Sequence, residues 1–165
     1  MIKTAYIGIG SNLGDKLENC LKAIEKIDLS PGLSIKGQSD FYRTEPVGVR
    51  DQDWYVNGVI SLVTDLSPYE LFNNLMTIEL DMGRERKKKW DSRTIDLDIL
   101  FIGGDIIDDK DLTVPHPLMH LRRFVLVPMV QLAPDFIHPV LDKTMTELLD
   151  IFSLECQVVV PLKEA

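Results

Sequence analysis

The pattern of apolar and polar positions along the chain predicts a mixed α and β domain. In residues 4–10 the odd positions are apolar, whereas the other side carries Gly8 and Gly10 and is nearly bare, which predicts a strand. Apolar residues then recur at helical spacing after an N-cap at Asp15, and Ser67 opens a second helix with a capping box.

The predicted elements follow one another in the order β-α-β-β-α-β, with a C-terminal extension. Helices are predicted over 16–28, 68–82 and 123–132 and from Thr144 onward, and strands over 4–10, 33–44, 55–66, 95–102 and 157–160. This order is that of a ferredoxin-like α+β fold, an antiparallel sheet with helices on one face. We expect one domain over residues 1–165, with the other face of the sheet left for a ligand or a loop.

Composition fits this picture and restricts the class of protein. The 165 residues are 45% hydrophobic and 27% charged, which is ordinary for a globular chain. No apolar run approaches the ~20 residues of a membrane helix, and the N-terminus predicts a strand rather than a signal peptide. The two cysteines, Cys20 and Cys156, cannot form a disulfide framework. A reduced cytoplasmic protein is therefore expected.

The charge is unevenly distributed along the chain. The net charge is −8, which disfavours general affinity for nucleic acid. Residues 83–93 nevertheless hold six of the 18 basic residues and only two acids. A solvated surface segment explains such a run when it is considered alone. The residues that follow it favour an anion-binding role.

Two aspartates lie close together in the strand predicted over residues 95–102. Asp96 and Asp98 share one face of this strand, with Cα atoms ~6.5–7 Å apart, while apolar residues fill the other face. One interpretation is an edge strand with solvated acids. The other is a hard-cation site, because Mg²⁺ typically takes one or two carboxylates and completes its shell with water and phosphate oxygens. The preceding arginines suit the phosphate of such a complex.

Two further positions are candidates for chemistry, and one glycine-rich segment is not. Glu79 falls inside the apolar arc of the second helix, and a buried glutamate needs a partner, either an arginine or a ligand. His116 is a candidate for hydrogen bonding to phosphate, or a satisfied loop histidine. The glycines of residues 8–14 are spaced one residue too far apart for a dinucleotide fingerprint.

Several segments together resemble one known family over almost the whole chain. They are Tyr6-Ile7-Gly8-Ile9-Gly10-Ser11-Asn12-Leu13-Gly14, Tyr42-Arg43-Thr44-Glu45-Pro46-Val47-Gly48, Tyr55-Val56-Asn57, Ile78-Glu79-Leu80, Gly83-Arg84, Trp90, Arg93-Thr94-Ile95-Asp96-Leu97-Asp98-Ile99, Leu112-Thr113-Val114-Pro115-His116 and Arg122-Arg123-Phe124-Val125-Leu126. In this order they resemble the 6-hydroxymethyl-7,8-dihydropterin pyrophosphokinases of folate biosynthesis.

The resemblance implies a reaction and its metal. A diphosphate would pass from ATP to the 6-hydroxymethyl group of the reduced pterin, and AMP would leave. Asp96 and Asp98 would hold two Mg²⁺ ions, the role that the strand pattern itself suggests. Arg84 and Arg93 would be catalytic, since they would stabilise charge on the transferred group.

The resemblance also implies the residues that contact ATP. Arg86 and His116 would bind its phosphates, and Arg122 would belong to the same site. Ile99 and Thr113 would line the adenine and ribose site.

The pterin site is implied in the same way. Asn57 would read the amide-like edge of the pterin with its own donor and acceptor. Tyr55 and Phe124 would be the aromatic residues of the pocket, with Phe124 stacking on the ring, and Thr44 and Val47 would add backbone contacts.

Supporting residues and departures complete the resemblance. Asn12 and Glu79 would support the site, and Trp90, catalytic by the same likeness, would sit in a mobile loop that closes over the substrates. Ser92 stands where the family often has proline, so the loop tip is less restrained. Asp111 replaces a basic residue that some members place near the ATP.

Two rival functions have the same predicted topology. A nucleic-acid-binding module would use 84–93 as a basic loop, but residues 95–102 carry aspartates where such modules have stacking aromatics. A regulatory small-molecule-binding domain would not require paired aspartates beside arginines. We therefore expect a monomeric enzyme of ATP and a reduced pterin, without nucleic-acid or membrane partners.

Overall fold

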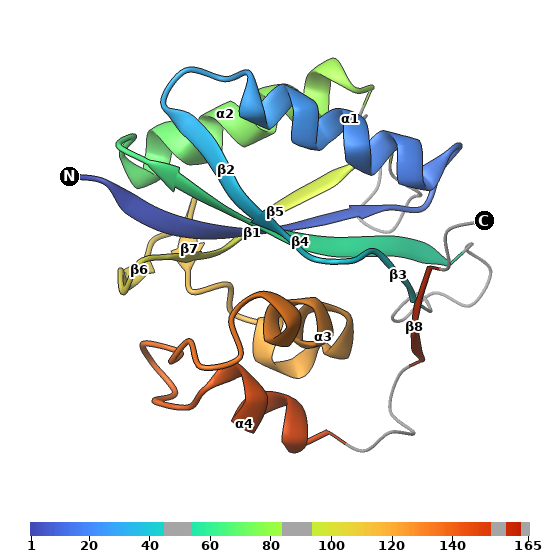
Figure 1. Cartoon of the computed structure of the whole chain (residues 1–165). Coiled ribbons are helices and arrows are strands. Elements are labelled where there is room, and N and C mark those ends of the chain that lie inside the picture. The colour runs from blue at the N-terminus through green and yellow to red at the C-terminus, as the bar shows by residue number, and fades with distance from the viewer. Residues whose placement is uncertain (45–53, 84–93, 153–157, 163–165) are drawn as a thin grey trace.

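The computed structural model describes residues 1–44, 54–83, 94–152 and 158–162. These residues form a six-stranded sheet with two helices on each face, as Figure 1 shows. The sheet strands are β1 (Lys3–Ser11), β2 (Leu33–Gln38), β3 (Tyr42–Thr44), β4 (Tyr55–Thr64), β5 (Asp96–Ile102) and β8 (Val159–Pro161). The helices are α1 (Lys16–Asp28), α2 (Pro68–Asp81), α3 (Arg123–Leu132) and α4 (Met145–Asp150), with a 3-10 turn η1 (Met119–Leu121). A separate hairpin joins β6 (Ile107–Asp108) to β7 (Thr113–Val114).

The sheet has the spatial order β5-β1-β4-β3-β8, and β2 also pairs with β4. All of these pairings are antiparallel. The strands in the middle of the sheet are β1 and β4, which run side by side from Lys3 opposite Thr64 to Ser11 opposite Val56. The predicted class, α+β with an antiparallel sheet, is confirmed.

The first two helices follow the sequence closely, because their ends are set by local caps. The Asp15 carboxylate accepts a hydrogen bond from the Glu18 N–H at the start of α1. Ser67 and Glu70 form the predicted capping box at the start of α2. Gly83 follows the end of α2 with a φ of +88°, a conformation that glycine adopts without strain.

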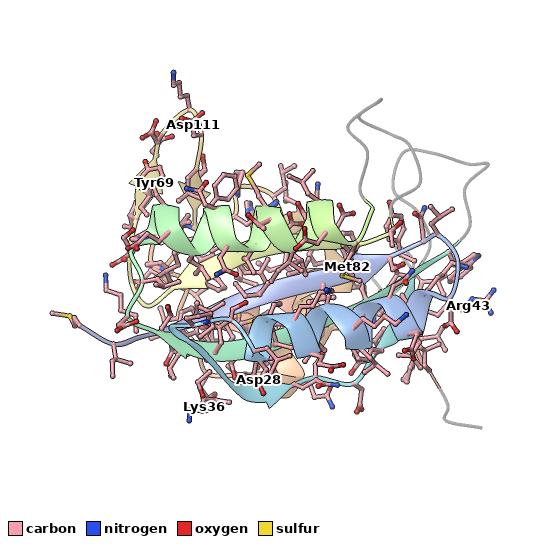
Figure 2. The ribbon with its side chains drawn as sticks, turned by 90° about the horizontal axis from the view of Figure 1, so that it is seen from above. Asp28, Lys36, Arg43, Tyr69, Met82 and Asp111 are labelled. Atoms are coloured by element: carbon pink, nitrogen blue, oxygen red, sulfur yellow. The ribbon has the colours of Figure 1, made fainter. Side chains whose placement is uncertain are left out.

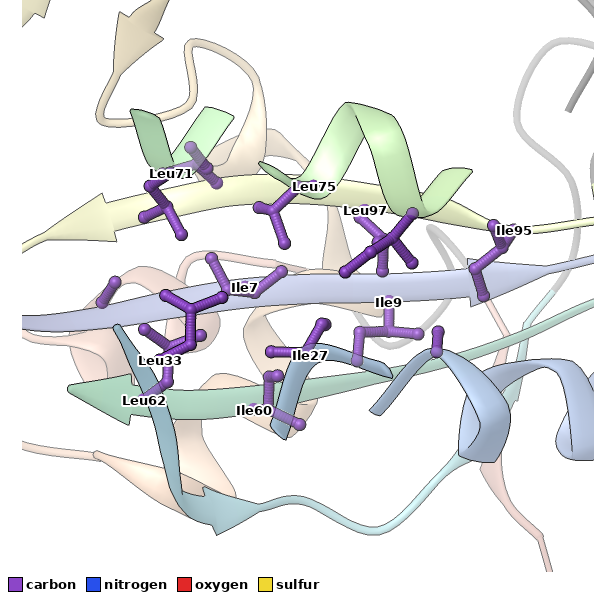
Figure 3. Close-up of a cluster of buried hydrophobic side chains, with 14 of the residues drawn as sticks. Ile7, Ile9, Ile27, Leu33, Ile60, Leu62, Leu71, Leu75, Ile95 and Leu97 are labelled. Atoms are coloured by element: carbon purple, nitrogen blue, oxygen red, sulfur yellow. The ribbon is translucent and has the colours of Figure 1, made fainter. Parts of the chain in front are cut away.

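Aliphatic side chains fill the space between the sheet and the helices α1 and α2. Figure 3 shows this cluster: Ile7 and Ile9 from β1 meet Leu75 from α2 and Ile27 from α1. Cys20 belongs to it, as predicted, and burial raises the pKa of its thiol to about 12. The alternation of side chains therefore turns the odd positions of β1 toward these helices and leaves Gly8 and Gly10 on the opposite face.

The prediction that helices cover one face is wrong for the chain as a whole. The C-terminal extension places α3 and α4 on the face opposite α1 and α2 (Figure 1). A second cluster joins them to the sheet, with Leu126 and Met129 of α3 packed with Phe101 of β5. The two helices of the extension carry more apolar side chains than they can bury against each other. They bury the rest against the face of the sheet that α1 and α2 leave uncovered.

The predicted strand over residues 33–44 is divided into β2 and β3. Between them the Ser39 hydroxyl accepts the N–H of Val59, 2.9 Å away, in place of a strand carbonyl. The Asp40 N–H is bound by the side chain of Gln131 in α3. These side-chain bonds replace the ladder, so the strand is interrupted. A register shift between Ile35 and Gly37 also bends β2.

The last strand lies at an edge of the sheet. In β8, Val159 pairs with Thr44 and Pro161 with Tyr42, so β3 lies between β4 and β8. This confirms a terminal strand close to the one expected over 157–160. Among the described residues, no helix is long and apolar enough to cross a membrane.

Candidate active site

One row of residues crosses three strands near the end of β1. Gly10 of β1 pairs with Asp96 of β5 on one side and with Asn57 of β4 on the other. Directly opposed residues in antiparallel strands project to the same face. Their neighbours Ile9, Val56 and Leu97 belong to the aliphatic cluster under α1 and α2. The row therefore faces the side of the sheet that carries α3 and α4.

The two aspartates share this face, as the sequence predicted. Asp98 lies two residues after Asp96 in β5 and is exposed, while Asp96 is half-buried. Between them Leu97 turns its side chain into the aliphatic cluster. Gly10 brings no side chain between Asp96 and Asn57.

Glu79 holds the strand between the two aspartates. Its side chain, on α2, is only 4% exposed. Its Oε2 accepts the Leu97 N–H at 2.8 Å. The sequence predicted that Glu79 is buried, but considered only an arginine or a ligand as its partner. The structure adds a main-chain amide of the strand that carries the aspartates, a partner that helical periodicity cannot indicate.

Asn57 of β4 is held by Thr44 of the adjacent strand β3. Its Nδ2 donates to Thr44 Oγ1 at 2.6 Å, and the two residues are 8% and 1% exposed. A Cβ atom on Gly10 would lie 2.4 Å from Asn57 Oδ1 and 3.7 Å from Cδ1 of Tyr55. The structure thus brings Thr44, Tyr55, Asn57 and the aspartates to one region of the sheet.

The loop after β1 is fixed from α1. Ser11 and Asn12 are buried, although they lie beyond the apolar part of the strand. The Asn19 side chain donates to the Leu13 carbonyl at 2.8 Å and to the Ser11 hydroxyl at 3.3 Å. Asn12 therefore has a fixed place next to the row formed by Asp96, Gly10 and Asn57. The sequence pattern alone gave no indication of Asn19 as the residue that orders this loop.

His116 lies along the outer edge of β5. Its main-chain N–H donates to the Leu100 carbonyl at 3.0 Å, and its Nδ1 accepts the Leu118 N–H at 3.1 Å. Burial and, secondly, the charge of Arg122 lower the pKa of His116 to about 4. The ring is therefore neutral at pH 7, with its proton on Nε2, and it can donate one hydrogen bond to an acceptor.

The hairpin β6–β7 carries Thr113 to the same edge, and α2 holds this hairpin. The Tyr69 hydroxyl donates to the Asp109 carboxylate at 2.5 Å. This bond lowers the pKa of Asp109, because it favours the charged carboxylate. Figure 2 shows Tyr69 and Asp111 at the end of the molecule where α2 begins, with Arg43 at the opposite end. Neither the hairpin nor this bond was predicted.

The beginning of α3 adds an aromatic and a cationic side chain. Arg122 is the N-terminal flanking residue of α3, and its Cζ lies 5.7 Å from the centre of the Phe124 ring. Such a distance is within the range of a cation–π contact. Phe124 is partly buried against the cluster formed by α3, α4 and β5. Its position on this face of the sheet agrees with the face that carries Asn57.

The remaining predicted residues lie either on the opposite face of the sheet or outside the described residues. Ile99 lies in β5, but its side chain is buried in the aliphatic cluster on the opposite face from the aspartates. Only its main chain is thus available to a ligand on the outer edge of the strand. The predicted mobile loop lies outside the described residues. So do six residues named above: Val47, Arg84, Arg86, Trp90, Ser92 and Arg93.

The carboxylates of β5 are the candidate ligands for a divalent cation. Within the described part of the chain, no group of three or more His, Cys, Asp or Glu side chains gathers as a metal site. Two carboxylates on one strand, Asp96 and Asp98, suit Mg²⁺, which commonly takes one or two carboxylates and the oxygens of a phosphate substrate. The residues present therefore fit Mg²⁺ brought together with a polyphosphate.

Comparison with known proteins identifies the family. The family model described as 7,8-dihydro-6-hydroxymethylpterin-pyrophosphokinase (HPPK) matches residues 6–134. The chain belongs to the HPPK family. A 2-amino-4-hydroxy-6-hydroxymethyldihydropteridine pyrophosphokinase from Haemophilus influenzae is 41% identical over 150 residues, 91% of this chain and 93% of that protein. The protein of the same name from Pseudomonas aeruginosa is 42% identical over 135 residues, 82% of this chain and 83% of the other.

Solved structures of the HPPK family show the same fold. A crystal structure of a Plasmodium falciparum HPPK-DHPS superimposes with a TM-score of 0.72 at 13% identity. The match covers 91% of this chain but 43% of that one, so the chain spans less than half of the longer HPPK-DHPS protein. The HPPK likeness is thus confirmed in sequence and in fold.

Proposed function

We propose that this chain transfers a diphosphate from ATP to 6-hydroxymethyl-7,8-dihydropterin in folate biosynthesis and releases AMP. Membership of the HPPK family supports this reaction. The structural observation that supports it is the row of Asp96, Gly10 and Asn57, in which a carboxylate and a carboxamide share one face of the sheet. A phosphate-metal complex and a polar heterocycle can then lie side by side.

The pterin would bind on the β3 and β4 side of the row. Asn57, oriented by Thr44, would exchange hydrogen bonds with the amide-like edge of the pterin. Tyr55 and Phe124 would supply the aromatic contacts, with Phe124 stacking on the ring. Thr44 and Val47 would add main-chain contacts. Because Asn57 is 8% exposed, a ligand with an unmatched edge would leave the hydrogen-bonding capacity of Asn57 that Thr44 does not use buried and unpaired.

The nucleotide would bind on the β5 side. His116 would donate its Nε2–H to a phosphate oxygen as a neutral group, and Arg86 and Arg122 would supply positive charge. Thr113 and the main chain of Ile99 would line the adenine and ribose site. The main-chain groups of residues two apart in a strand point to the same edge. Since the Leu97 N–H points outward to Glu79, the main chain of Ile99 faces outward as well.

Asp96 and Asp98 would hold two Mg²⁺ ions together with ATP. Mg²⁺ held there would supply charge neutralisation and a template for the displacement. Glu79 would keep the two carboxylates in place through the Leu97 amide, and Asn12 would support the end of β1.

The transfer itself breaks one bond and forms another. The hydroxymethyl oxygen attacks the β-phosphorus of ATP, the bond from this phosphorus to the α,β-bridging oxygen breaks, and AMP leaves with that oxygen. The hydroxyl proton is released to solvent. Arg84 and Arg93 would stabilise the charge on the transferred group, and Trp90 would belong to a loop that excludes water.

Several finer properties belong to the same proposal. The β5-β1-β4-β3 order with two connecting helices supports a ferredoxin-like core, and the shared sheet supports one domain over residues 1–165. We infer a cytoplasmic monomer; the buried free thiol of Cys20 suits a reducing compartment.

The experiment that tests the function is a product assay. Purified protein is incubated with ATP, Mg²⁺ and 6-hydroxymethyl-7,8-dihydropterin. The nucleotides and pterins are then separated by chromatography and identified by mass spectrometry. AMP and a pterin diphosphate should form in equal amounts, and neither should form without the pterin. ADP with a pterin monophosphate, or AMP without a modified pterin, would contradict the proposal.

A further inference from the structure

We propose that Gly10 and Thr44 are positioning residues for pterin recognition, and that both act through Asn57. Because Gly10 has no side chain, the Asn57 carboxamide can lie directly against β1. Thr44 supplies the hydrogen bond that keeps the carboxamide there. This inference rests on the proposed function, which assigns Asn57 to the pterin. It goes further because it gives a role to a residue without any side chain.

A side chain at position 10 would force the Asn57 carboxamide to move. A Cβ atom at this position would lie 2.4 Å from Asn57 Oδ1 and 3.5 Å from its Cγ. Atoms that are not bonded do not approach to 2.4 Å, so even an alanine would displace the carboxamide. Main-chain freedom is not the reason, because Gly10 is paired in β1 and is not among the glycines with positive φ.

The contact at Thr44 closes the other side. Asn57 Nδ2 donates to Thr44 Oγ1 at 2.6 Å, and Thr44 is 1% exposed. Rotation of the carboxamide away from a new Cβ would break this bond to a hydroxyl on a residue that is almost fully buried. Asn57 therefore has one favourable orientation, set by β1 on one side and by β3 on the other. This orientation presents its remaining hydrogen-bonding capacity to the ligand.

The chain offers a matched control on the same strand face. Gly8 lies two residues before Gly10 and faces the same way. A Cβ there would meet the Leu100 side chain at 3.6 Å, an ordinary van der Waals distance. Gly8→Ala and Gly10→Ala thus introduce the same methyl group into the same strand. Only Gly10→Ala places it against Asn57.

The experiment measures the two ligands separately by calorimetry. A non-hydrolysable ATP analogue with Mg²⁺ is titrated into each variant, and 6-hydroxymethyl-7,8-dihydropterin is titrated into the protein saturated with that analogue. Gly10→Ala should weaken pterin binding by about tenfold or more, a loss expected when a buried polar group is misplaced. Its affinity for the analogue, and both affinities of Gly8→Ala, should change less than about twofold.

A double-mutant cycle separates positioning through Asn57 from a general structural effect. Asn57→Ala removes the carboxamide, so adding Gly10→Ala to it should cost less than about twofold in pterin affinity. Equal losses from Gly10→Ala with and without Asn57 would overturn the inference. So would pterin binding that Gly10→Ala and Gly8→Ala weaken equally.

Thr44 keeps the inference testable if Gly10→Ala does not fold. Thr44→Val retains the shape but removes the hydroxyl, and it should weaken pterin binding about tenfold, whereas Thr44→Ser should bind within about twofold of the wild type. Wild-type binding by Thr44→Val would contradict the inference. Absence of pterin binding by the wild-type protein would instead overturn the proposed function, and the inference with it.

Discussion

The two faces of the sheet are made by the same strands but do different work. On one face, Ile7 and Ile9 of β1 pack with side chains from α1 and α2, and the space is filled with aliphatic groups. On the other face, the intervening Gly8 and Gly10 carry no side chain, and polar residues flank Gly10 at Asp96 and Asn57. A two-residue period thus lets one strand contribute to a closed core and to an open, polar region.

The face opposite α1 and α2, called the polar face from here on, has a covered part and a polar part. Toward one end, α3 and α4 cover it through a cluster rich in aromatic and methionine side chains, including Phe101, Phe136 and Met129. The rings of Phe101 and Phe136 lie 4.6 Å apart between centroids. Toward the other end lie Asn57 and the aspartates. The face packed with α1 and α2 is thus filled with aliphatic side chains, whereas the opposite face gives up part of its burial to polar residues.

The largest expected effect is on the polar face. Asp98→Ala should lower turnover about a hundredfold or more, because a metal ligand contributes several kcal/mol to the transition state. The free energy of unfolding should stay equal or rise, since two neighbouring carboxylates repel each other. Turnover and chemical denaturation are measured on the same preparation, with Asp65→Ala, an exposed position, as the control. Near-normal turnover at saturating Mg²⁺ would rule out the metal role.

On the face packed with α1 and α2, a substitution should affect stability without affecting chemistry. Leu71→Ala, at a fully buried position of α2, should lower the free energy of unfolding by about 2–5 kcal/mol. The Michaelis constants of the folded protein should not change. Leu80→Ala on the same helix, at a 55% exposed position, should cost less than about 0.5 kcal/mol. Similar losses for both variants in denaturant titrations would contradict this description of the core.

Glu79 links α2 to the strand that carries the aspartates. Its substitution should therefore affect both stability and turnover. Glu79→Leu leaves the Leu97 amide without this acceptor and should cost about 1–3 kcal/mol in the free energy of unfolding. Glu79→Gln keeps an oxygen that can accept the bond and should cost less. Turnover should fall more in Glu79→Leu than in Glu79→Gln, because Leu97 lies between Asp96 and Asp98. The idea fails if the two variants behave alike in both assays.

The smallest effect concerns pH and His116. The folded-state pKa of about 4 lies below the ordinary value of 6.5. Between these values the unfolded chain binds more protons, so this histidine makes stability fall as pH is lowered from 6.5 toward 4. Its contribution is fully present above pH 6.5. His116→Asn should therefore show a shallower loss of stability over this window in thermal denaturation, and the wild-type ring should keep its neutral NMR shifts at pH 6.

Local signals account for what the sequence predicted correctly. The bounds of α1 are those predicted, and α2 ends one residue earlier than expected. Each signal, the Asp15 cap, the Ser67 capping box and Gly83, lies within a few residues of the helix end that it sets. The shared face of Asp96 and Asp98 follows from strand alternation alone.

Non-local pairing accounts for what the sequence did not show. The break between β2 and β3 depends on Ser39 bonding to Val59 and on Asp40 meeting Gln131 of α3, contacts that no short window contains. The Glu79 bond to Leu97 and the close approach of Gly10 to Asn57 depend in the same way on which strands are neighbours. The covering of the second face was missed because short helices of an extension carry no sign of the surface that buries them.

The short strand β8 bears on how the protein behaves at high concentration. An open strand edge invites pairing with another chain, which leads to aggregation. β8 covers β3 with three residues, and Pro161 among them has no N–H to offer a further strand. On the opposite edge, Glu79 and the His116 main chain already bind groups of β5. At β2 the register shift and the exposed Lys36 discourage a partner. These features protect the edges of the described sheet against pairing with a further strand.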